Sequence, residues 1–354
     1  MATQPRIKLA ERIASELRRM IATGIYPANS FLPPERQLAL DFKTSRNTIL
    51  SALDILADEG YIEKSRGRGT RILPRDMDIR SIPVALIHSI PMRDVSRGLE
   101  GFFLMQGMQD TLANLGFTYH MVHDVGPDIC SADSIVERFK AAVFLEDQDR
   151  ELIQALQERQ FPVTVANIES DLQVSGTWVD HRKYTIQAVD LLVGLGHRKI
   201  SFISPEPKMC FFGKSRDGYL TGLKNAGIEP EDSYIIEIEH PTALDAYIAT
   251  QKLLSSPYPP TAIIAARDII AEGVCKAASE AGLAVGRDIS VIGFDDVSWP
   301  EEEPWLTTFR EPCYQLGAVA VEMLVERIVS DGPALEQREL MPTLMIRRSA
   351  GPCM

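Results

Sequence analysis

Apolar and polar residues follow a pattern over residues 1–75 that predicts three helices and a hairpin. The first helix carries one apolar stripe, at Leu9, Ile13, Leu17 and Ile21. A second, short helix opens at Pro33–Arg36, because proline is tolerated in a first turn, where its missing donor is not needed. A third helix follows Ser45, a good N-cap, and ends at Gly60. The glycine-rich turn at 65–69, between two short strands, then predicts a hairpin.

Three helices followed by a basic hairpin make a winged helix-turn-helix, in which the start of the third helix reaches base edges in the major groove. Those positions hold hydrogen-bonding residues: Ser45, Arg46, Asn47 and Thr48. Arg36 on the second helix and Arg66 and Arg68 on the hairpin are placed for phosphate or minor-groove contacts. The alternative is that the polar helix start is only a cap and that the arginines are only solvated. The joint pattern favours DNA.

Net charge separates this region from the rest of the chain. The whole chain carries 37 Lys and Arg against 49 Asp and Glu, a net charge of −12, which is unusual for a DNA-binding protein. Residues 1–75, however, hold 13 Lys and Arg against 8 Asp and Glu, so the remainder carries all of the acidic excess. A basic head on an acidic body is the asymmetry that nucleic-acid binding produces.

The segment LPPERQLALDFKTSRNTILSALDILADEGYIEKSRGRGTRI resembles the GntR family of regulators. It has the family's Pro-x-Glu-Arg helix start, Ser-Arg-x-Thr recognition helix and Gly-x-Gly-Thr wing. The resemblance implies that DNA-contact or wing-turn positions fall on Arg36, Ser45, Arg46, Thr48, Gly67 and Gly69. Leu50 departs from the family, which often has a second arginine there, and this puts one DNA contact in question. The resemblance also implies a dimer on a palindromic operator.

From residue 84 onward, short apolar runs alternate with amphipathic stretches. The runs are the length of strands: Val84–His88, Ala141–Leu145, Val163–Ala166, Ile200–Ser204, Ile235–Ile238, Ala262–Ala265 and Ser290–Phe294. Helical spacing marks Glu100–Leu115, Lys183–Leu195 and Ile269–Ala281. Repeated βα units with fully apolar strands predict parallel sheets covered on both faces, in two doubly wound α/β lobes. Ligands of such folds bind beyond the carboxyl ends of the strands, between the lobes.

Motifs for enzymatic chemistry are missing. The chain has no phosphate-cradling loop, dinucleotide fingerprint, nucleophile elbow or His-Glu-x-x-His pair. Its five cysteines form no Cys-x-x-Cys pair and its six histidines are dispersed, so we expect no cofactor, metal or disulfide framework. His197 is interpreted as a structural turn residue. The apolar runs are too short for a membrane span and the N-terminus has no signal-peptide block, so we expect a cytoplasmic protein.

The region from 84 onward resembles the LacI family of sugar-responsive repressors. The matching segments include FPVTVAN, VDHRKYTIQAVDLLVGLGHRKISFIS, SRDGYLTGLKNAGI, PPTAIIAARDIIAEGVCKAASEAGLAVGRDISVIGFDD, PWLTTFREP and MPTLMIRRS. The resemblance implies a periplasmic-binding-protein-like fold of two Rossmann-like lobes, three crossovers and a ligand between them. We therefore divide the chain into a winged helix-turn-helix at 1–75, a linker at 76–83 and a body at 84–354. Lobe 1 takes about 84–179 and 313–340, and lobe 2 about 180–312 and 341–354.

The LacI resemblance implies a set of effector-binding residues. Arg216 matches the arginine that holds ligand hydroxyls or a carboxylate, and Asp295 and Asn167 match polar ligand contacts. Further acids expected at strand ends or loops beside the ligand are Asp268, Glu311 and Glu146. Arg267 departs from the family, which often has a small or amide side chain. A second arginine there favours an acidic sugar or sugar phosphate, unless it pairs with Asp268 or Glu311. Aromatic rings that could stack on a sugar are Trp299, Phe211, Phe212 and Trp178.

Together these features predict a homodimeric transcription regulator without enzymatic activity, similar in architecture to AraR-type repressors. We expect a sugar or sugar-acid effector to close the lobes, change the spacing of the two heads and relieve repression of carbohydrate-utilisation genes. One rival is a transport-type binding protein, which the basic head and the missing signal peptide disfavour. The other is a sugar-metabolising enzyme with a DNA-binding head, but adjacent carboxylates such as Asp295 and Asp296 point apart and make a poor catalytic pair.

Overall fold

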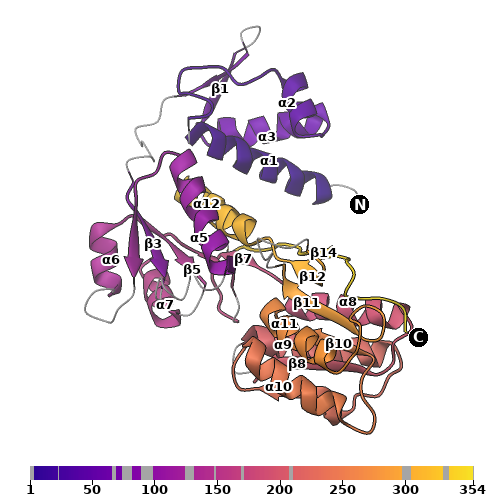
Figure 1. Cartoon of the computed structure of the whole chain (residues 1–354). Coiled ribbons are helices and arrows are strands. Elements are labelled where there is room, and N and C mark those ends of the chain that lie inside the picture. The colour runs from indigo at the N-terminus through magenta and orange to yellow at the C-terminus, as the bar shows by residue number, and fades with distance from the viewer. Residues whose placement is uncertain are drawn as a thin grey trace.

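The chain folds into a small head and two α/β lobes, which follow one another from top to lower right in Figure 1. The computed structural model describes residues 4–22, 24–65, 69–73, 82–88, 99–123, 131–146, 149–168, 171–206, 210–296, 304–329 and 335–353. Both lobes are built on a sheet of six described strands. The predicted winged helix-turn-helix and the two doubly wound lobes are confirmed.

The head is a three-helix unit closed by an antiparallel hairpin. Its elements are α1 (Gln4–Ala22), α2 (Glu35–Asp41), α3 (Arg46–Asp58), β1 (Ile62–Ser65) and β2 (Gly69–Ile72). Leu17, Leu38 and Ile49, one from each helix, are fully buried together. The Ser45 side chain accepts a hydrogen bond from the Thr48 N–H at 3.3 Å, as the predicted N-cap requires. Gly60 leaves the helix with a φ of +74°, which glycine adopts without strain.

Lobe 1 contains a parallel sheet in the order β13-β7-β6-β5-β3-β4. Its strands are β3 (Val84–His88), β4 (Tyr119–His123), β5 (Ala141–Leu145), β6 (Val163–Ala166), β7 (Gly176–Trp178) and β13 (Gln337–Glu339). Its helices are α5 (Leu99–Asn114), α6 (Ala132–Arg138), α7 (Arg150–Glu158) and α12 (Cys313–Val329). Alternate residues of β3 and β5 enter two different apolar clusters, one under α5 and α12 and one under α6 and α7, so the sheet is covered on both faces.

Lobe 2 contains a sheet in the order β14-β12-β11-β10-β8-β9, in which only β14 is antiparallel. Its strands are β8 (Ile200–Pro205), β9 (Ile235–Ile238), β10 (Ala262–Ala265), β11 (Ser290–Asp295), β12 (Thr307–Arg310) and β14 (Thr343–Met345). Its helices are α8 (His181–Gly194), α9 (Cys210–Asn225), the 3-10 turn η2 (Asp232–Tyr234), α10 (Ala243–Leu254) and α11 (Asp268–Glu280). Helix α8 packs beside α9, and α10 beside α11.

The chain passes between the lobes three times, always near the carboxyl end of a strand. The crossovers follow β7, β12 and β13 and lead into α8, α12 and β14. Because β7 and β12 belong to different sheets, their carboxyl ends meet at the junction of the lobes. Residues at the carboxyl ends of the other parallel strands therefore lie along the edges that border this junction.

Candidate nucleic-acid interface and interlobe site

The start of α3 presents polar side chains outward. Ser45, Arg46 and Asn47 are exposed. Thr48 differs, because only 7% of its surface is exposed and its hydroxyl lies 2.8 Å from that of Ser45. Three of the four predicted contact residues on this helix are therefore accessible, while Thr48 supports the turn that holds them.

Arg46 is held in place by a carboxylate of the preceding helix. Its Nε donates to Glu35 Oε2 at 2.7 Å, and 58% of the arginine side chain stays exposed. Arg36, the next residue on α2, is exposed without such a bond among the contacts described. The ion pair orients the Arg46 guanidinium beside the start of α3 and leaves most of its donors open to solvent.

The hairpin supplies the second part of this surface. Gly69 begins β2 with a φ of +96°, and a Cβ at this position would lie 3.5 Å from the ring of Phe31. Arg71 donates to Asn29 Oδ1 at 3.0 Å. Arg66, Gly67 and Arg68, which were predicted to form the wing tip, lie outside the described residues.

Four residues at the junction of the lobes have a left-handed backbone although none is glycine. Their φ angles are 63° for Glu146, 65° for Asn167, 113° for Asp295 and 58° for Asp296. These residues end β5, β6 and β11. Such conformations cost of order 1–3 kcal/mol each and cluster at functional sites. Three of the four, Glu146, Asn167 and Asp295, are predicted effector residues, and we call this group with Arg267 the interlobe site.

Arg267 and Asp295 form an ion pair within the interlobe site. The Arg267 Nε donates to Asp295 Oδ2 at 2.7 Å, with only 25% and 5% of the two side chains exposed. The sequence had suggested Asp268 or Glu311 as the arginine's partner. The partner that the structure describes is a third acid, contributed by the neighbouring strand β11.

Asp268 and Glu311 both make structural contacts, Asp268 within lobe 2 and Glu311 between two of the crossover segments. Asp268 is 1% exposed, accepts the Thr308 hydroxyl at 2.7 Å and fills the space over Gly293, where a Cβ would lie 2.1 Å from its Oδ1. Glu311 lies in the second crossover, 3.5 Å from the His181 ring at the end of the first. Asp268 therefore packs inside lobe 2, and Glu311 joins two of the crossovers.

Arg216 lies on α9 and pairs with an acid on the edge strand β9. Its Nη1 donates to Glu237 Oε1 at 2.8 Å, and about a third of the arginine side chain, 35%, is exposed. Glu237 stands beside Ser204 near the carboxyl end of β8, so the pair borders the same edge of the sheet as Asp295. The sequence did not indicate Glu237.

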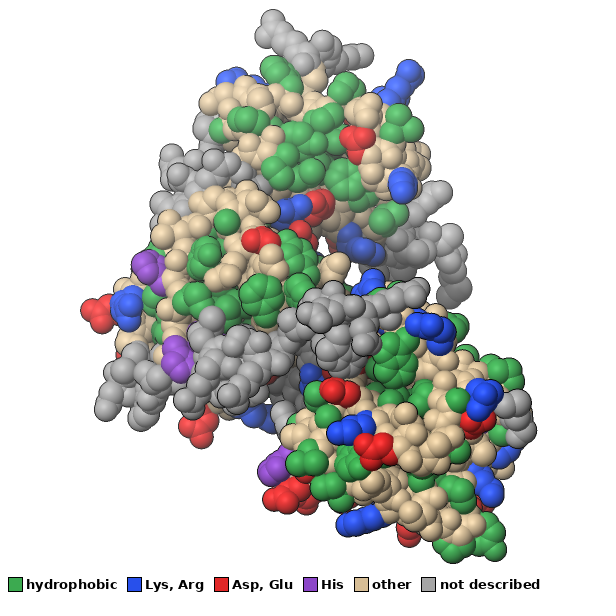
Figure 2. Space-filling model, viewed as in Figure 1, with side chains coloured by type: hydrophobic (Ala, Val, Ile, Leu, Met, Phe, Trp, Pro, Cys, Tyr) green, Lys and Arg blue, Asp and Glu red, His purple; other side chains and the backbone are tan. Residues whose placement is uncertain are grey.

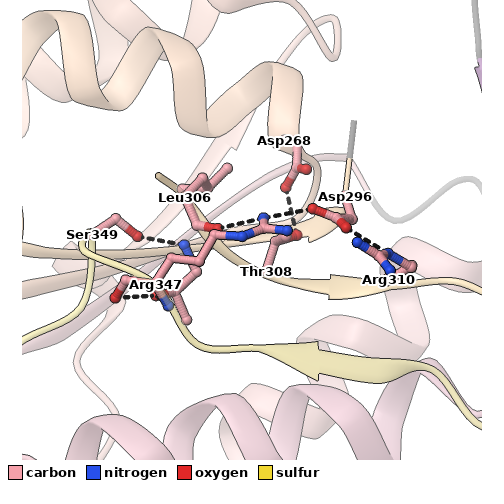
Figure 3. Close-up of polar contacts among 8 residues, drawn as sticks. Asp268, Asp296, Leu306, Thr308, Arg310, Arg347 and Ser349 are labelled. Atoms are coloured by element: carbon pink, nitrogen blue, oxygen red, sulfur yellow. Dashed lines mark hydrogen bonds and ion pairs between the residues drawn. The ribbon is translucent and has the colours of Figure 1, made fainter. Parts of the chain in front are cut away.

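Asp296 anchors the C-terminal part of lobe 2. Its carboxylate, 2% exposed, accepts from Arg310 Nε at 2.6 Å and from Arg347 Nη1 at 2.5 Å (Figure 3). Burial alone would raise the pKa of Asp296, but the hydrogen bonds from Arg347 and Arg310 outweigh it and hold the pKa below its ordinary value. Arg347 also donates to the Leu306 carbonyl, so β11, β12 and the segment after β14 are tied together. The sequence indicates no structural role for Asp296.

The aromatic side chains proposed for stacking on a sugar are mostly not available for it. Phe212 is 2% exposed and belongs to the core, and Trp178 is half-buried at the end of β7. Trp299 and the side chain of Phe211 lie outside the described part of the chain. His197 is buried, and its ring contacts Thr261, Ser290 and the Gly351 carbonyl at 2.9–3.0 Å, which fits its predicted structural role.

No group of three or more His, Cys, Asp or Glu side chains among the described residues could hold a metal ion. No described helix is long and apolar enough to span a membrane.

Two family profiles match separate parts of the chain. Residues 9–72 match the profile of the bacterial regulatory proteins of the gntR family, and residues 189–350 match the periplasmic binding protein-like domain. Among curated proteins, the HTH-type transcriptional repressor PurR of Edwardsiella ictaluri is 38% identical over 159 residues, which are 45% of this chain and 46% of PurR. The chain thus spans about half the length of the curated relatives it matches.

Solved structures of similar fold cover about three quarters of the chain. A regulatory protein of the LacI family from Chloroflexus aggregans is 25% identical, with a TM-score of 0.65 over 76% of this chain and 98% of that one. A LacI family transcriptional regulator from Enterococcus faecium, solved with bound ribose, is 23% identical, with a TM-score of 0.63 over 77% and 100%. The latter likeness shows the fold alone.

Proposed function

We propose that this chain, a GntR-family head on a LacI-family, periplasmic-binding-protein-like body, is a transcription repressor whose affinity for its operator changes when a sugar-like effector binds between the lobes. The observation that carries the proposal is that one chain contains both features: an exposed, pre-oriented Arg46 at the start of α3, and strained polar residues at the lobe junction. The relatives described above are transcription regulators, which speaks against the enzyme alternative.

DNA recognition is assigned to the exposed start of α3 and to the hairpin. Arg46 can donate two hydrogen bonds to guanine, and Asn47 lies beside it on the same exposed turn. Glu35 holds the guanidinium before DNA arrives, which lowers the entropy lost on binding. Arg36 and the wing residues Arg66 and Arg68 are proposed to contact phosphates.

The effector is proposed to be a sugar or sugar acid held by Asn167, Glu146 and the Arg267–Asp295 pair. Carboxylate oxygens accept from vicinal hydroxyls while a guanidinium donates in a fixed fork, which together suit a polyol. Both predicted ligand arginines already face a carboxylate: Arg267 faces Asp295, and Arg216 faces Glu237. This pairing favours a neutral sugar over a phosphorylated one. The Enterococcus faecium protein of similar fold was solved with bound ribose, so this fold can accommodate a small sugar.

We further propose that the chain works as a homodimer on a palindromic site, since two heads at a fixed separation match two half-sites. Size-exclusion chromatography with light scattering should give twice the chain's mass of 39.4 kDa. A monomer at micromolar concentration, with or without DNA, would contradict this part of the proposal.

The DNA assignment is tested with operator sequences selected from random duplexes by the full chain. Arg46→Ala should weaken binding to the selected site by about 5- to 150-fold, the loss expected for a bidentate base contact. Arg150→Ala is the matched control, because Arg150 is an exposed arginine of lobe 1 in an equivalent 2.7 Å pair with Asp171. Equal affinity of the two variants would overturn the assignment of α3.

A further inference from the structure

The head is docked on lobe 1 through helix α12. Helix α1 packs on α12, and Val329, the last residue of α12, packs against the apolar core of the head. The hydroxyl of the buried Tyr61 donates a hydrogen bond to the Val329 carbonyl oxygen at 2.8 Å. This carbonyl is one of the last four of the helix, which have no partner within it, so Tyr61 caps the C-terminus of α12 from the head.

Charged residues of both partners surround this contact. Arg19 of α1 is 12% exposed; its hydrogen bond to Glu16, together with the nearby Glu322 and Glu326 of α12, holds the pKa of the arginine above its ordinary value. Glu326 is 12% exposed and pairs with Arg338 at 2.6 Å. Figure 2 shows side chains of both signs gathered where the head meets lobe 1. Cations near the C-terminal end of α12 also match its helix dipole.

The other half of α12 is bonded to the sheet of lobe 1 beside the interlobe site. The fully buried Thr177 of β7 donates its hydroxyl to the Leu316 carbonyl of α12 at 3.0 Å. The Thr177 hydroxyl oxygen in turn accepts a hydrogen bond from the backbone N–H of Asn167 at 3.2 Å. Asn167 is a strained residue of the interlobe site, so one threonine hydroxyl joins that site to α12.

We propose that Thr177, α12 and Tyr61 form a continuous series of contacts, called the line below, through which effector binding at the lobe junction changes the position of the DNA-binding head. A change at Asn167 alters the bond that Thr177 can make to Leu316, and α12 moves as one rigid element that carries the capped Val329 and the head with it. The head then follows lobe 1 directly and does not depend on the linker at 76–83. This inference rests on the proposed function and adds the route of its regulation.

Two pairs of matched variants isolate the line. Thr177→Val and Thr164→Val each remove a buried hydroxyl that donates to a carbonyl of α12, but Thr164 bonds Ala320 at 2.9 Å without contacting the interlobe site in the described contacts. Tyr61→Phe and Tyr234→Phe each remove a tyrosine hydroxyl bound to a backbone carbonyl, but Tyr234 bonds Tyr258 at 2.9 Å within lobe 2. Only the first member of each pair lies on the line.

The test compares operator affinity with and without sugar for the full-length variants. D-ribose, L-arabinose, D-glucose, cellobiose, D-glucuronate and glucose 6-phosphate serve as probes. The wild type should respond by about 5- to 150-fold to the sugar that stabilises it. Thr177→Val and Tyr61→Phe should reduce that response at least about threefold, while Thr164→Val and Tyr234→Phe keep it. An undiminished response in both line variants would overturn the inference.

Deuterium exchange gives a readout that needs neither DNA nor sugar. Tyr61→Phe should speed exchange about two- to tenfold in 319–329 and in α1, the loss expected for one hydrogen bond across the contact. Unchanged exchange would contradict docking whatever the fate of the proposed function. A wild type that binds no operator, or is stabilised by no sugar, would instead contradict the proposed function, and the exchange result would still decide the docking.

Discussion

Single residues at the lobe junction combine burial, charge and backbone strain. Asp296 lies in the left-handed region, is almost wholly buried and pairs with two arginines from later segments of the chain. Breaking a buried ion pair by removing one partner is strongly destabilising, because the remaining charge keeps its desolvation cost. Asp296 therefore secures lobe 2, while its neighbour Asp295 faces Arg267.

Asp296→Asn should lower the free energy of unfolding by about 3 kcal/mol, since the amide keeps the shape and loses the charge. Urea unfolding followed by fluorescence measures this change. Asp171→Asn is the control: Asp171 also accepts from an arginine, Arg150, but it is exposed, and its substitution should leave the urea midpoint unchanged. Equal midpoints for the two variants would contradict the role given to Asp296.

The lowered pKa of Asp296 also predicts a pH dependence. A carboxylate whose pKa is lower in the folded than in the unfolded chain contributes stability that is complete above the unfolded pKa, about 3.9, and is lost as the pH falls below it. The difference in stability between the wild type and Asp296→Asn should therefore shrink as the pH falls from 5 toward about 3. A difference that stays constant over this range would contradict the assignment.

The positions of these residues could be predicted, but their partners could not. Glu146, Asn167 and Asp295 follow apolar runs, and that alone places them at strand ends. Their positive φ angles could not be predicted from the sequence, because Asn167 and Asp295 are of types that adopt both backbone regions and Glu146 is of a type that rarely has a positive φ. Arg267 lies 28 residues from Asp295 and Arg216 lies 21 residues from Glu237, and such pairs depend on which strands become neighbours.

At the scale of elements, close helix packing in lobe 1 depends on small residues. Gly317 of α12 lies against the backbone of α5, and a Cβ there would lie 2.1 Å from the Leu104 carbonyl oxygen. The two helices thus approach more closely than any side chain at this position would allow. Because α12 also supports the head, this contact fixes the position of the element that joins body and head.

Gly317→Ala should force α5 and α12 apart and cost about 1–3 kcal/mol or more, as overpacking does. Gly194→Ala is the matched control at the end of α8, where an added Cβ meets nothing within 4 Å. It should be neutral or stabilise the chain by up to about 1 kcal/mol, because alanine restricts the unfolded chain. Thermal unfolding of both variants measures the difference, and a Gly317→Ala variant as stable as Gly194→Ala would contradict the close approach.

Short apolar runs predicted β3, β5, β6, β8, β9, β10 and β11, whereas the edge strands β4, β13 and β14 and the interior strands β7 and β12 were not predicted. Strand β4 reads Tyr-His-Met-Val-His and is partly exposed at the edge of its sheet, so it lacks an apolar run. Strands β13 and β14 have three residues each, too few for a period to be recognised. β14 is antiparallel, and nothing in its composition distinguishes it from the parallel strands.

At the scale of the whole molecule, the head and body form one connected structure. The sequence predicted the two parts and the linker between them, but not the contact of Tyr61 with Val329, residues separated by 268 positions. Such contacts depend on how folded domains pack against each other, which the pattern of residues within each domain does not show. Their consequence is a head whose orientation is set by lobe 1.

The measurement that tests the account most directly is a fluorescence-anisotropy titration of the full chain onto its selected operator, with and without the sugar that raises its melting temperature. The account predicts that the sugar weakens operator binding by at least about fivefold, because it favours the conformation whose heads fit the two half-sites less well. A sugar that stabilises the body while leaving operator affinity unchanged would contradict the central claim that the body controls the head.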